Sequence, residues 1–367
     1  MKQVQYTLCL GAAFFTCLLT GAQENTVNLD PVTVTSTISA VASSKTGRNI
    51  VVIGGDRFKS LPVNSIDELL RYVPGVEVQS RGPMGAQSDI VIRGGTFQQV
   101  LVILDGIRLN DPITGHFNSY IPLSPFEIER IEILKGASSA IYGSEAVGGV
   151  VHIITKTFAS KEGTTKKEAA ASLAAGKYNL INAQIGGFHH KGKTAVGGGF
   201  LTNNATGAPQ RGGRGYFNLH TASLSASHFI SPQMKIAIRS SYDDRSFAAQ
   251  NFYTSFVSDT ATEQVRSSWN HLNLTYQKQK NRLSFDAGYK AVSDHYAFNP
   301  RAVANDNKSN LGQLLIQNEH RINSKVIVNA GLQFINRKIK SNDRGNHQET
   351  QAALFTLLQY SSPSGLN

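Results

Sequence analysis

Sulfur is scarce in this 367-residue chain, which holds only two cysteines, Cys9 and Cys17. Both lie in an N-terminal segment where Lys2 precedes a mostly apolar run and small residues end at Ala22, the pattern of a secretory signal. A lipoprotein signal through Cys17 is an alternative, but the preceding Phe-Phe-Thr fits it poorly. Cleavage near Ala22 would remove both thiols, which excludes disulfides and thiol-based metal or redox chemistry from the rest of the chain.

Long apolar runs and clustered charge are also lacking. After residue 22 no run is long enough for a transmembrane helix, so any membrane span must consist of alternating β-strands. The formal net charge is +11, but the basic residues are scattered and do not interleave with aromatic residues, which disfavours nucleic-acid binding. On a secreted chain this charge favours contact with anionic lipid headgroups or an anionic ligand.

Residues 23 to about 160 have the pattern of a compact α/β domain. Asn64-Ser65 can cap a short helix that Pro74-Gly75 ends, with one apolar face made of Ile66, Leu69, Leu70 and Val73. Ser-Pro-Phe-Glu at 124–127 fits a capping box with proline at the first helical position. Short β-branched runs predict buried strands at 50–53, 89–92, 100–104 and 150–154.

The remainder, from about Ala169, is dominated by period-two alternation. Leu283, Phe285 and Ala287 alternate with polar or small residues, as expected for about ten strands with an apolar outer face and a polar inner face. Short turns at 189–193, 230–233, 277–280 and 322–325 alternate with longer polar segments at 203–215, 243–262, 294–308 and 339–349. Outer-membrane barrels alternate their connections in this way, whereas a soluble β-sandwich, the other option, has no reason to do so.

Four segments of the first domain carry a family resemblance. They are Ser65-Ile-Asp-Glu-Leu-Leu-Arg-Tyr-Val-Pro-Gly-Val76, Asp89-Ile-Val-Ile-Arg-Gly-Gly95, Val102-Ile-Leu-Asp-Gly-Ile-Arg-Leu-Asn110 and the Gly- and Ser-rich stretch from Ile128 to Lys156. Their order and spacing resemble the plug domain of TonB-dependent outer-membrane receptors, and most closely the vitamin B12 transporter branch of that family. The resemblance implies an α+β plug followed by antiparallel transmembrane β-barrel strands, active transport without a cofactor, and a place in the bacterial outer membrane.

The resemblance also implies an energy-coupling segment, the TonB box. An extended β-branched segment of this kind adds as a strand to the edge of the TonB protein's sheet. An ordinary first plug strand is the alternative. The segment that fits comprises Leu29, Asp30, Pro31, Val32, Thr33, Val34 and Thr35.

Two arginines match positions that tie the plug to barrel glutamates in the family. Here they are Arg93 and Arg130, and solvated surface positions are the alternative. Unpaired charge is costly in a partly dry lumen, so such pairs would hold the plug in place.

The cargo is expected to touch the outward loops of the plug, at residues 81–88 and 111–120. Both loops are rich in turn-forming residues, and the second mixes aromatic faces with hydrogen-bonding groups suited to a large amphipathic ligand. Packing of the plug against the barrel wall is the alternative for each residue. The candidates for substrate binding are Met84, Gln87, Thr114, His116, Phe117, Asn118 and Tyr120.

The nature of the cargo stays open between a cobalt corrinoid and a ferric siderophore. The calcium sites of the B12 branch need clustered carboxylates, which the first long loop, 203–214, does not contain. That loop is basic, which suits a more anionic ligand, although solvation or contact with lipopolysaccharide would also account for it. No metal site or enzyme motif is predicted: no nucleophile elbow, Walker A or dinucleotide fingerprint occurs.

The expected organisation is a signal peptide over 1–22, the TonB-box segment over 23–45, the plug over 46–160 and part of a transmembrane barrel over 161–367. The family's transporter barrels have about twenty-two strands, so about ten strands predict a truncated or split transporter. A fragment would expose unpaired strand edges to lipid, so it is not expected to transport alone. The alternative function is surface binding or adhesion without transport.

Overall fold

The computed structural model describes residues 32–33, 41–42, 49–82 and 86–360. Val32–Thr33 (β1) pairs antiparallel with Val41–Ala42 (β2). The predicted signal, the other five residues of the predicted TonB box and Met84 lie outside the described residues. The predicted signal and TonB box therefore stay predictions.

The first domain is built on a five-stranded sheet with the order β3-β8-β9-β6-β7. β8 and β9 are antiparallel, and β9 runs parallel to β6. A second, two-stranded sheet joins β4 and β5. The strands are β3 (Ile50–Gly54), β4 (Val76–Ser80), β5 (Ser88–Ile92), β6 (Val100–Leu104), β7 (Ile107–Arg108), β8 (Ile128–Lys135) and β9 (Gly149–Thr155).

Short helices connect these strands. They are α2 (Arg57–Ser60), α3 (Ile66–Leu70), η2 (Phe97–Gln99), η3 (Gly115–Ser119), η4 (Pro125–Glu127), α4 (Ser139–Tyr142), η5 (Ser144–Ala146) and α5 (Lys156–Ala159). The four predicted buried strands match β3, β5, β6 and β9 to within one residue at either end. Branched apolar residues from both faces of β6 and β9 are fully buried, which makes this sheet the centre of the core.

The predicted helix is present as α3, and its apolar residues are buried as expected. Its N-terminus is held differently from the prediction, because the Ser65 side chain makes no capping hydrogen bond. Instead, the carboxylate of Glu68 accepts from the backbone N–H of Asn64 at 2.8 Å. This bond satisfies the N–H of the residue before the N-cap, so none of the first N–H groups of the helix is capped by the Ser65 side chain. At 124–127 the glutamate arm of the predicted capping box is present, since Ser124 N donates to Glu127 Oε1 at 2.9 Å.

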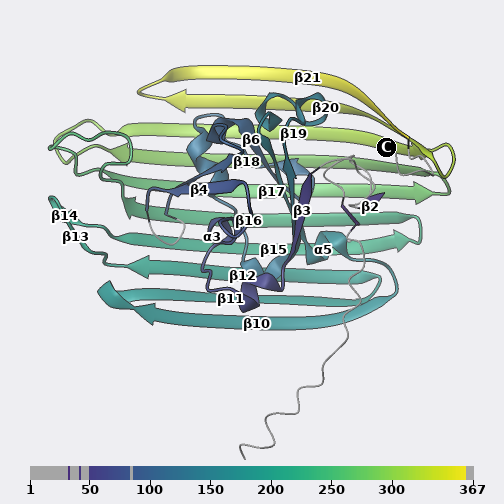
Figure 1. The fold of residues 1–367 in the computed structure, drawn as a ribbon, viewed down its shortest axis with the longest axis horizontal. Helices are drawn as coiled ribbons and strands as arrows, with labels where there is room; N and C mark the ends of the chain where they lie inside the picture. The colour runs from purple at the N-terminus through teal and green to yellow at the C-terminus, as the bar shows by residue number, and fades with distance from the viewer. Residues whose placement is uncertain (1–31, 34–40, 43–48, 83–85, 361–367) are drawn as a thin grey trace, which may run out of the picture. The chain divides into compact units, whose positions relative to one another are not determined.

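The rest of the chain forms one antiparallel ten-stranded sheet in sequence order (Figure 1). Its polar residues face the plug and its apolar residues face away: in β18, Ser284 and Asp286 are buried while Leu283 and Tyr289 are exposed. The predicted alternation is therefore confirmed. The strands are β10 (Thr164–Gly176), β11 (Leu180–Gly192), β12 (Thr194–Ala205), β15 (Phe217–Ser231), β16 (Met234–Ala248), β17 (Thr262–Lys278), β18 (Asn281–Ala297), β19 (Asn305–Arg321), β20 (Val326–Ser341) and β21 (Gly345–Tyr360).

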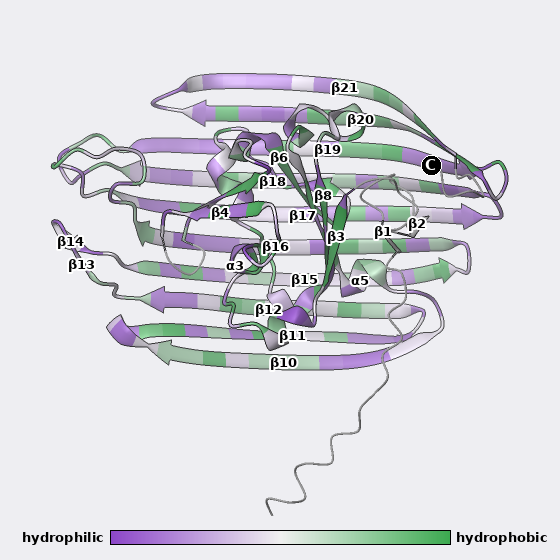
Figure 2. Ribbon diagram, viewed as in Figure 1, coloured by the Kyte–Doolittle hydropathy of each residue, from purple (hydrophilic) through white to green (hydrophobic). Residues whose placement is uncertain are grey.

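The connections follow the predicted alternation with one exception. The segment between β12 and β15 contains a small hairpin, β13 (Pro209–Gln210) and β14 (Gly213–Arg214), and segments 249–261 and 298–304 are also long. The predicted long loop at 339–349 is wrong. Strands β20 and β21 continue through these polar residues, pairing Lys340 with Asn346, and only a tight turn ending at Gly345 (φ +79°) joins them. Figure 2 shows the polar stretch of both strands.

The plug lies against the polar face of this sheet (Figure 1). Helix η4 comes closest to β11 and β12 at two glycines. A Cβ atom on Gly199 would lie 2.4 Å from Cβ of Ser124, and one on Gly186 would lie 2.7 Å from Cβ of Phe126. Because glycine has no side chain, these two positions leave space on the sheet, and η4 occupies that space. Within the described ranges, no helix is long and apolar enough to cross a membrane.

Candidate functional site

The predicted cargo residues gather where η3 meets β5 and the segment 249–261, but most of them are buried. Phe117 and Tyr120 stack at 5.1 Å and are 2% and 3% exposed. Asn118 donates to the Phe97 carbonyl oxygen at 3.4 Å, and Gln87 is fully buried. In this structure these four side chains are buried in packing contacts of the plug, whereas Thr114 and His116 are partly exposed.

His116 is the most accessible ring of this group. Its Nδ1 lies 2.7 Å from Oδ1 of Asp89, and its ring stacks on Phe97 at 4.3 Å. Thr114 fixes the local turn by accepting from the His116 backbone N–H at 3.3 Å. The other carboxylate oxygen of Asp89 pairs with Arg81 at 3.1 Å. One buried carboxylate therefore orients an imidazole and a guanidinium at the same end of the plug.

The segment 249–261 is bonded to this end of the plug. The guanidinium of Arg81 donates to the Phe252 carbonyl oxygen, and Gln87 Nε2 donates to the Tyr253 hydroxyl at 2.7 Å. The Tyr253 hydroxyl in turn donates to Glu263 at 2.9 Å. Burial of the hydroxyl end and the adjacent charge of Glu263 raise the pKa of Tyr253. The hydroxyl therefore stays protonated and keeps donating at ordinary pH.

A buried ion-pair network joins the plug to the sheet. Arg239 of β16 is 3% exposed, and it donates to Asp105 at 3.3 Å and to Glu127 at 3.1 Å. A third contact, to the hydroxyl of Thr155, is 2.8 Å long. Asp105 also accepts from the backbone N–H and the hydroxyl of Thr155. Each charge in the network is thus paired and hydrogen-bonded, which makes burial of the charges tolerable.

Two further ionic contacts join other parts of the plug to the sheet. Lys290 of β18 lies 3.5 Å from the carboxylate of Asp111 and donates to the Leu109 carbonyl oxygen at 2.7 Å. The carboxylate of Glu145 lies between Arg108 of the plug, at 3.1 Å, and Arg337 of β20, at 2.9 Å. Burial lowers the pKa of Arg108, which remains a cation in any accessible range. The plug is therefore attached to several strands by charged groups.

The predicted lock residues make no such contact with the sheet. Arg130 pairs with Glu132 of the same strand at 2.8 Å. Among the described residues Arg93 forms no ion pair, and its guanidinium lies beside Gly136. The role of these two arginines as a lock stays a prediction. The ion pairs that do cross to the sheet were not predicted, because their partners, such as Arg239 and Glu127, are far apart in sequence.

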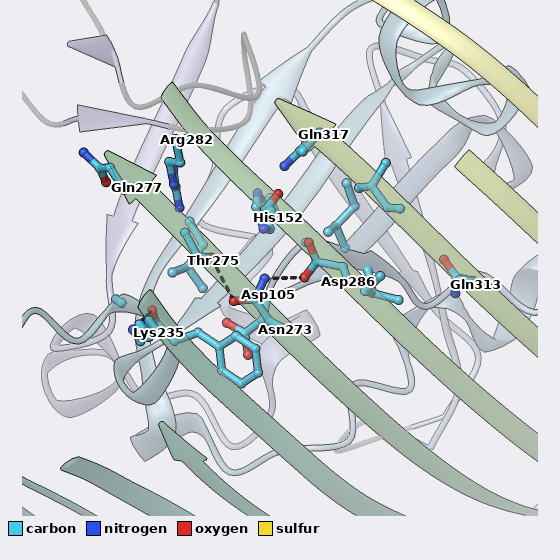
Figure 3. A pocket seen from close by; sticks show the side chains of 18 of the residues that line it. Asp105, His152, Lys235, Asn273, Thr275, Gln277, Arg282, Asp286, Gln313 and Gln317 are labelled. Atoms are coloured by element: carbon cyan, nitrogen blue, oxygen red, sulfur yellow. Dashed lines mark hydrogen bonds between the residues drawn. The ribbon is translucent and has the colours of Figure 1, made fainter. Parts of the chain in front are cut away.

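A cavity of about 680 Å³ lies between the plug and the short-turn ends of strands β16 to β19 (Figure 3). Its wall is rich in amides and cations from the sheet, including Lys235, Asn273, Gln277, Arg282 and Gln317. The plug contributes His152, whose pKa is lowered by burial. Across the ranges that the structure describes, no group of three or more His, Cys, Asp or Glu side chains could hold a metal ion.

Comparison with known proteins agrees with this architecture. Residues 42–150 match the family model described as TonB-dependent Receptor Plug Domain. The chain is 33% identical over 179 residues to the vitamin B12 transporter BtuB of Vibrio vulnificus, which covers 49% of this chain and 29% of that relative. It is 36% identical over 146 residues to BtuB of Vibrio cholerae, covering 39% and 23%. The matched part thus spans less than a third of these relatives.

Solved structures share the fold over most of the chain. The siderophore receptor PirA of Pseudomonas aeruginosa superposes with a TM-score of 0.63 at 17% identity, covering 84% of this chain and 52% of its own. The ferric enterobactin receptor PfeA of the same species gives 0.67 at 14% identity, covering 87% and 57%. The expected resemblance is confirmed: residues 42–150 are a TonB-dependent receptor plug domain, a domain of a receptor and transporter family, followed by a ten-stranded antiparallel sheet in the fold of TonB-dependent receptors.

Proposed function

We propose that the protein takes part in TonB-dependent import of a large, scarce nutrient across the bacterial outer membrane. The observation that carries this is the seating of the plug against the polar face of the sheet through paired, buried charges, with Arg239, Asp105 and Glu127 at their centre. Such an attachment holds a plug firmly and yet breaks without covalent chemistry. The relatives named as vitamin B12 transporters and siderophore receptors support a corrinoid or a ferric siderophore as the cargo class.

In this proposal the cargo binds at the end of the plug where η3 meets the segment 249–261, here called the apex, and where His116 and Thr114 are accessible. Contacts there compete with the bonds that tie the segment 249–261 to the plug. The TonB box at 29–35 then pairs with the TonB protein by β-augmentation. Pulling rearranges the plug and opens a path beside the sheet. The work comes from the energised partner, and the ligand contributes only by binding the states of the plug unequally.

Deletion of residues 29–35 tests transport directly. Uptake of labelled cyanocobalamin and of ferric enterobactin is measured in the source bacterium with the deletion made in the chromosomal gene, alongside binding of each to isolated outer membranes. Transport predicts that the deletion abolishes uptake of one cargo and leaves its binding intact. Binding without any effect of the deletion on uptake would favour a surface binding protein. A chain with the segment scrambled to an equal composition is the matched control for length.

A further inference from the structure

The wall of the cavity at the short-turn end contains more cationic side chains than carboxylates. Its wall carries five cationic side chains and three carboxylates. Two of the carboxylates are already occupied: Asp105 pairs with Arg239, and Asp286 accepts from Asn273 at 2.7 Å and lies 3.0 Å from His271. The third, Glu162, precedes the first strand of the sheet. Among the five cations, Arg108 and Arg130 pair with Glu145 and Glu132 outside the wall. Within the described residues, the cations without an ion pair are Lys161, Lys235 and Arg282.

Arg282 is the centre of this excess charge. It is half-buried at the start of β18, and among the described residues its guanidinium has neither an ion pair nor a hydrogen bond. Glu319 lies opposite it in the register of β18 and β19, but the carboxylate of Glu319 is bonded to Arg321 at 2.8 Å. Lys235 lines the same cavity (Figure 3), but its ammonium already donates to the carbonyl oxygens of Phe158 and Ser160 at 2.7 and 2.8 Å. Arg282 is therefore the cation of this wall whose donors are left open.

Polar groups suited to an anion surround Arg282. Gln277 is its register partner on β17, and Thr275 and Gln317 flank Ser284 two residues further along. Ser284 is 5% exposed, yet its hydroxyl, which can donate, has no hydrogen-bond partner among the described residues. Buried polar atoms are normally paired, so an unpaired hydroxyl near an unpaired guanidinium points to a missing acceptor.

We infer that this cavity binds a small oxyanion-bearing ligand, carboxylate or phosphate, with Arg282 as the principal contact. The planar guanidinium offers two parallel N–H donors to such a group, and Gln277 and Ser284 add neutral donors beside it. The site lies at the opposite end of the plug from His116 and Asp89, so it is distinct from the cargo site at the apex. A role for this site in binding an acidic cargo on its way past the plug depends on the proposed function, whereas the anion binding itself does not.

The purified full chain in detergent tests the site with three probes: citrate, inorganic phosphate and the neutral ester trimethyl citrate. Binding is followed by calorimetry and by the fluorescence of Trp269, the only tryptophan in the chain. Trp269 is buried, its ring lies 6.4 Å from that of His271, and His271 stacks on Phe158 of the cavity wall. Saturable binding of citrate or phosphate, with no binding of the ester, is expected. Tighter binding of citrate would indicate a carboxylate ligand, and tighter binding of inorganic phosphate would indicate a phosphate ligand.

Arg282→Gln should weaken anion binding at least about tenfold, because it removes the charge-assisted pair of bonds, and Arg282→Lys should weaken it less. Arg301→Gln, at an exposed loop position, is the matched control and should bind as wild type. Unchanged binding in Arg282→Gln, equal binding of the ester, or no saturation by either anion up to about 10 mM would overturn the inference. Arg282→Lys keeps the test valid if the Gln variant does not fold. The effect of deleting residues 29–35 on uptake does not depend on anion binding at Arg282. The transport proposal and the anion-site proposal can therefore be refuted independently.

Discussion

The guanidinium of Arg239 on β16 lies 3.1 Å from the carboxylate of Glu127 in η4, and both side chains are almost completely withdrawn from solvent. The two residues are 112 positions apart, and their pair is one of several that join the plug to the sheet. A buried pair of this kind contributes little net stability compared with an apolar contact, but its disruption is costly.

Arg239→Leu should therefore destabilise the attachment of the plug. The substitution leaves Asp105 and Glu127 as uncompensated buried charges, with a cost of about 3–5 kcal/mol in the free energy of unfolding. Denaturant titration and protease sensitivity of the plug would measure it. Arg266→Gln, which breaks the exposed pair with Asp244, is the control and should cost less than about 1 kcal/mol. Equal effects of the two substitutions would contradict the assignment.

Tyr253→Phe should loosen the segment 249–261 without disturbing the strands. The change removes the hydroxyl that links Gln87 to Glu263, and a net loss of about 1–2 kcal/mol is expected. Faster proteolytic cleavage within 249–261 and faster hydrogen exchange there would show it. Tyr242→Phe is the matched control, because that ring is exposed on the other face of the sheet. If both variants are cleaved at the wild-type rate, the hydroxyl does not hold the segment.

Acid should weaken the plug through His152. Burial lowers its pKa in the folded state below the ordinary value of 6.5, so the unfolded chain binds a proton that the folded chain does not. Its contribution to stability is therefore present above pH 6.5 and is lost as the pH falls through the window below it. Denaturation midpoints at pH 7.5 and 5.5 should differ less in His152→Gln than in wild type. His189→Gln, an exposed position, should keep the wild-type difference.

Gly199→Val should push η4 away from the sheet. The added side chain would meet Cβ of Ser124 and the Ile185 carbonyl oxygen, and overpacking of this kind costs about 1–3 kcal/mol. Unfolding titrations and amide hydrogen exchange of residues 124–127 would report the displacement. Gly312→Val is the control, since nothing lies within 4 Å of a Cβ atom there. Wild-type exchange rates at 124–127 in Gly199→Val would argue against a tight fit.

Local patterns predicted most of the strands and much less of the site. Alternation such as that around Leu283 and Phe285 depends only on which face of a strand is buried, so it can be seen in sequence. The tight turn at Gly345 was missed because polar strand residues beyond an apolar band look like loop residues. Arg130 was expected to cross to the sheet but has Glu132 two positions away on its own strand. Contacts such as Arg239 with Asp105 depend on how the plug is seated, and no local sequence pattern encodes that.

Two hydrogen bonds, from Arg81 to the Phe252 carbonyl oxygen and from Gln87 to the Tyr253 hydroxyl, have a thermodynamic consequence for any ligand that binds at the apex. These groups already have partners, so an arriving molecule must displace existing bonds and cannot simply add new contacts. Its measured affinity is then the difference between the bonds it makes and the bonds it displaces. Variants that weaken the segment 249–261 should therefore bind cargo more tightly, although they remove protein groups from the neighbourhood of the site.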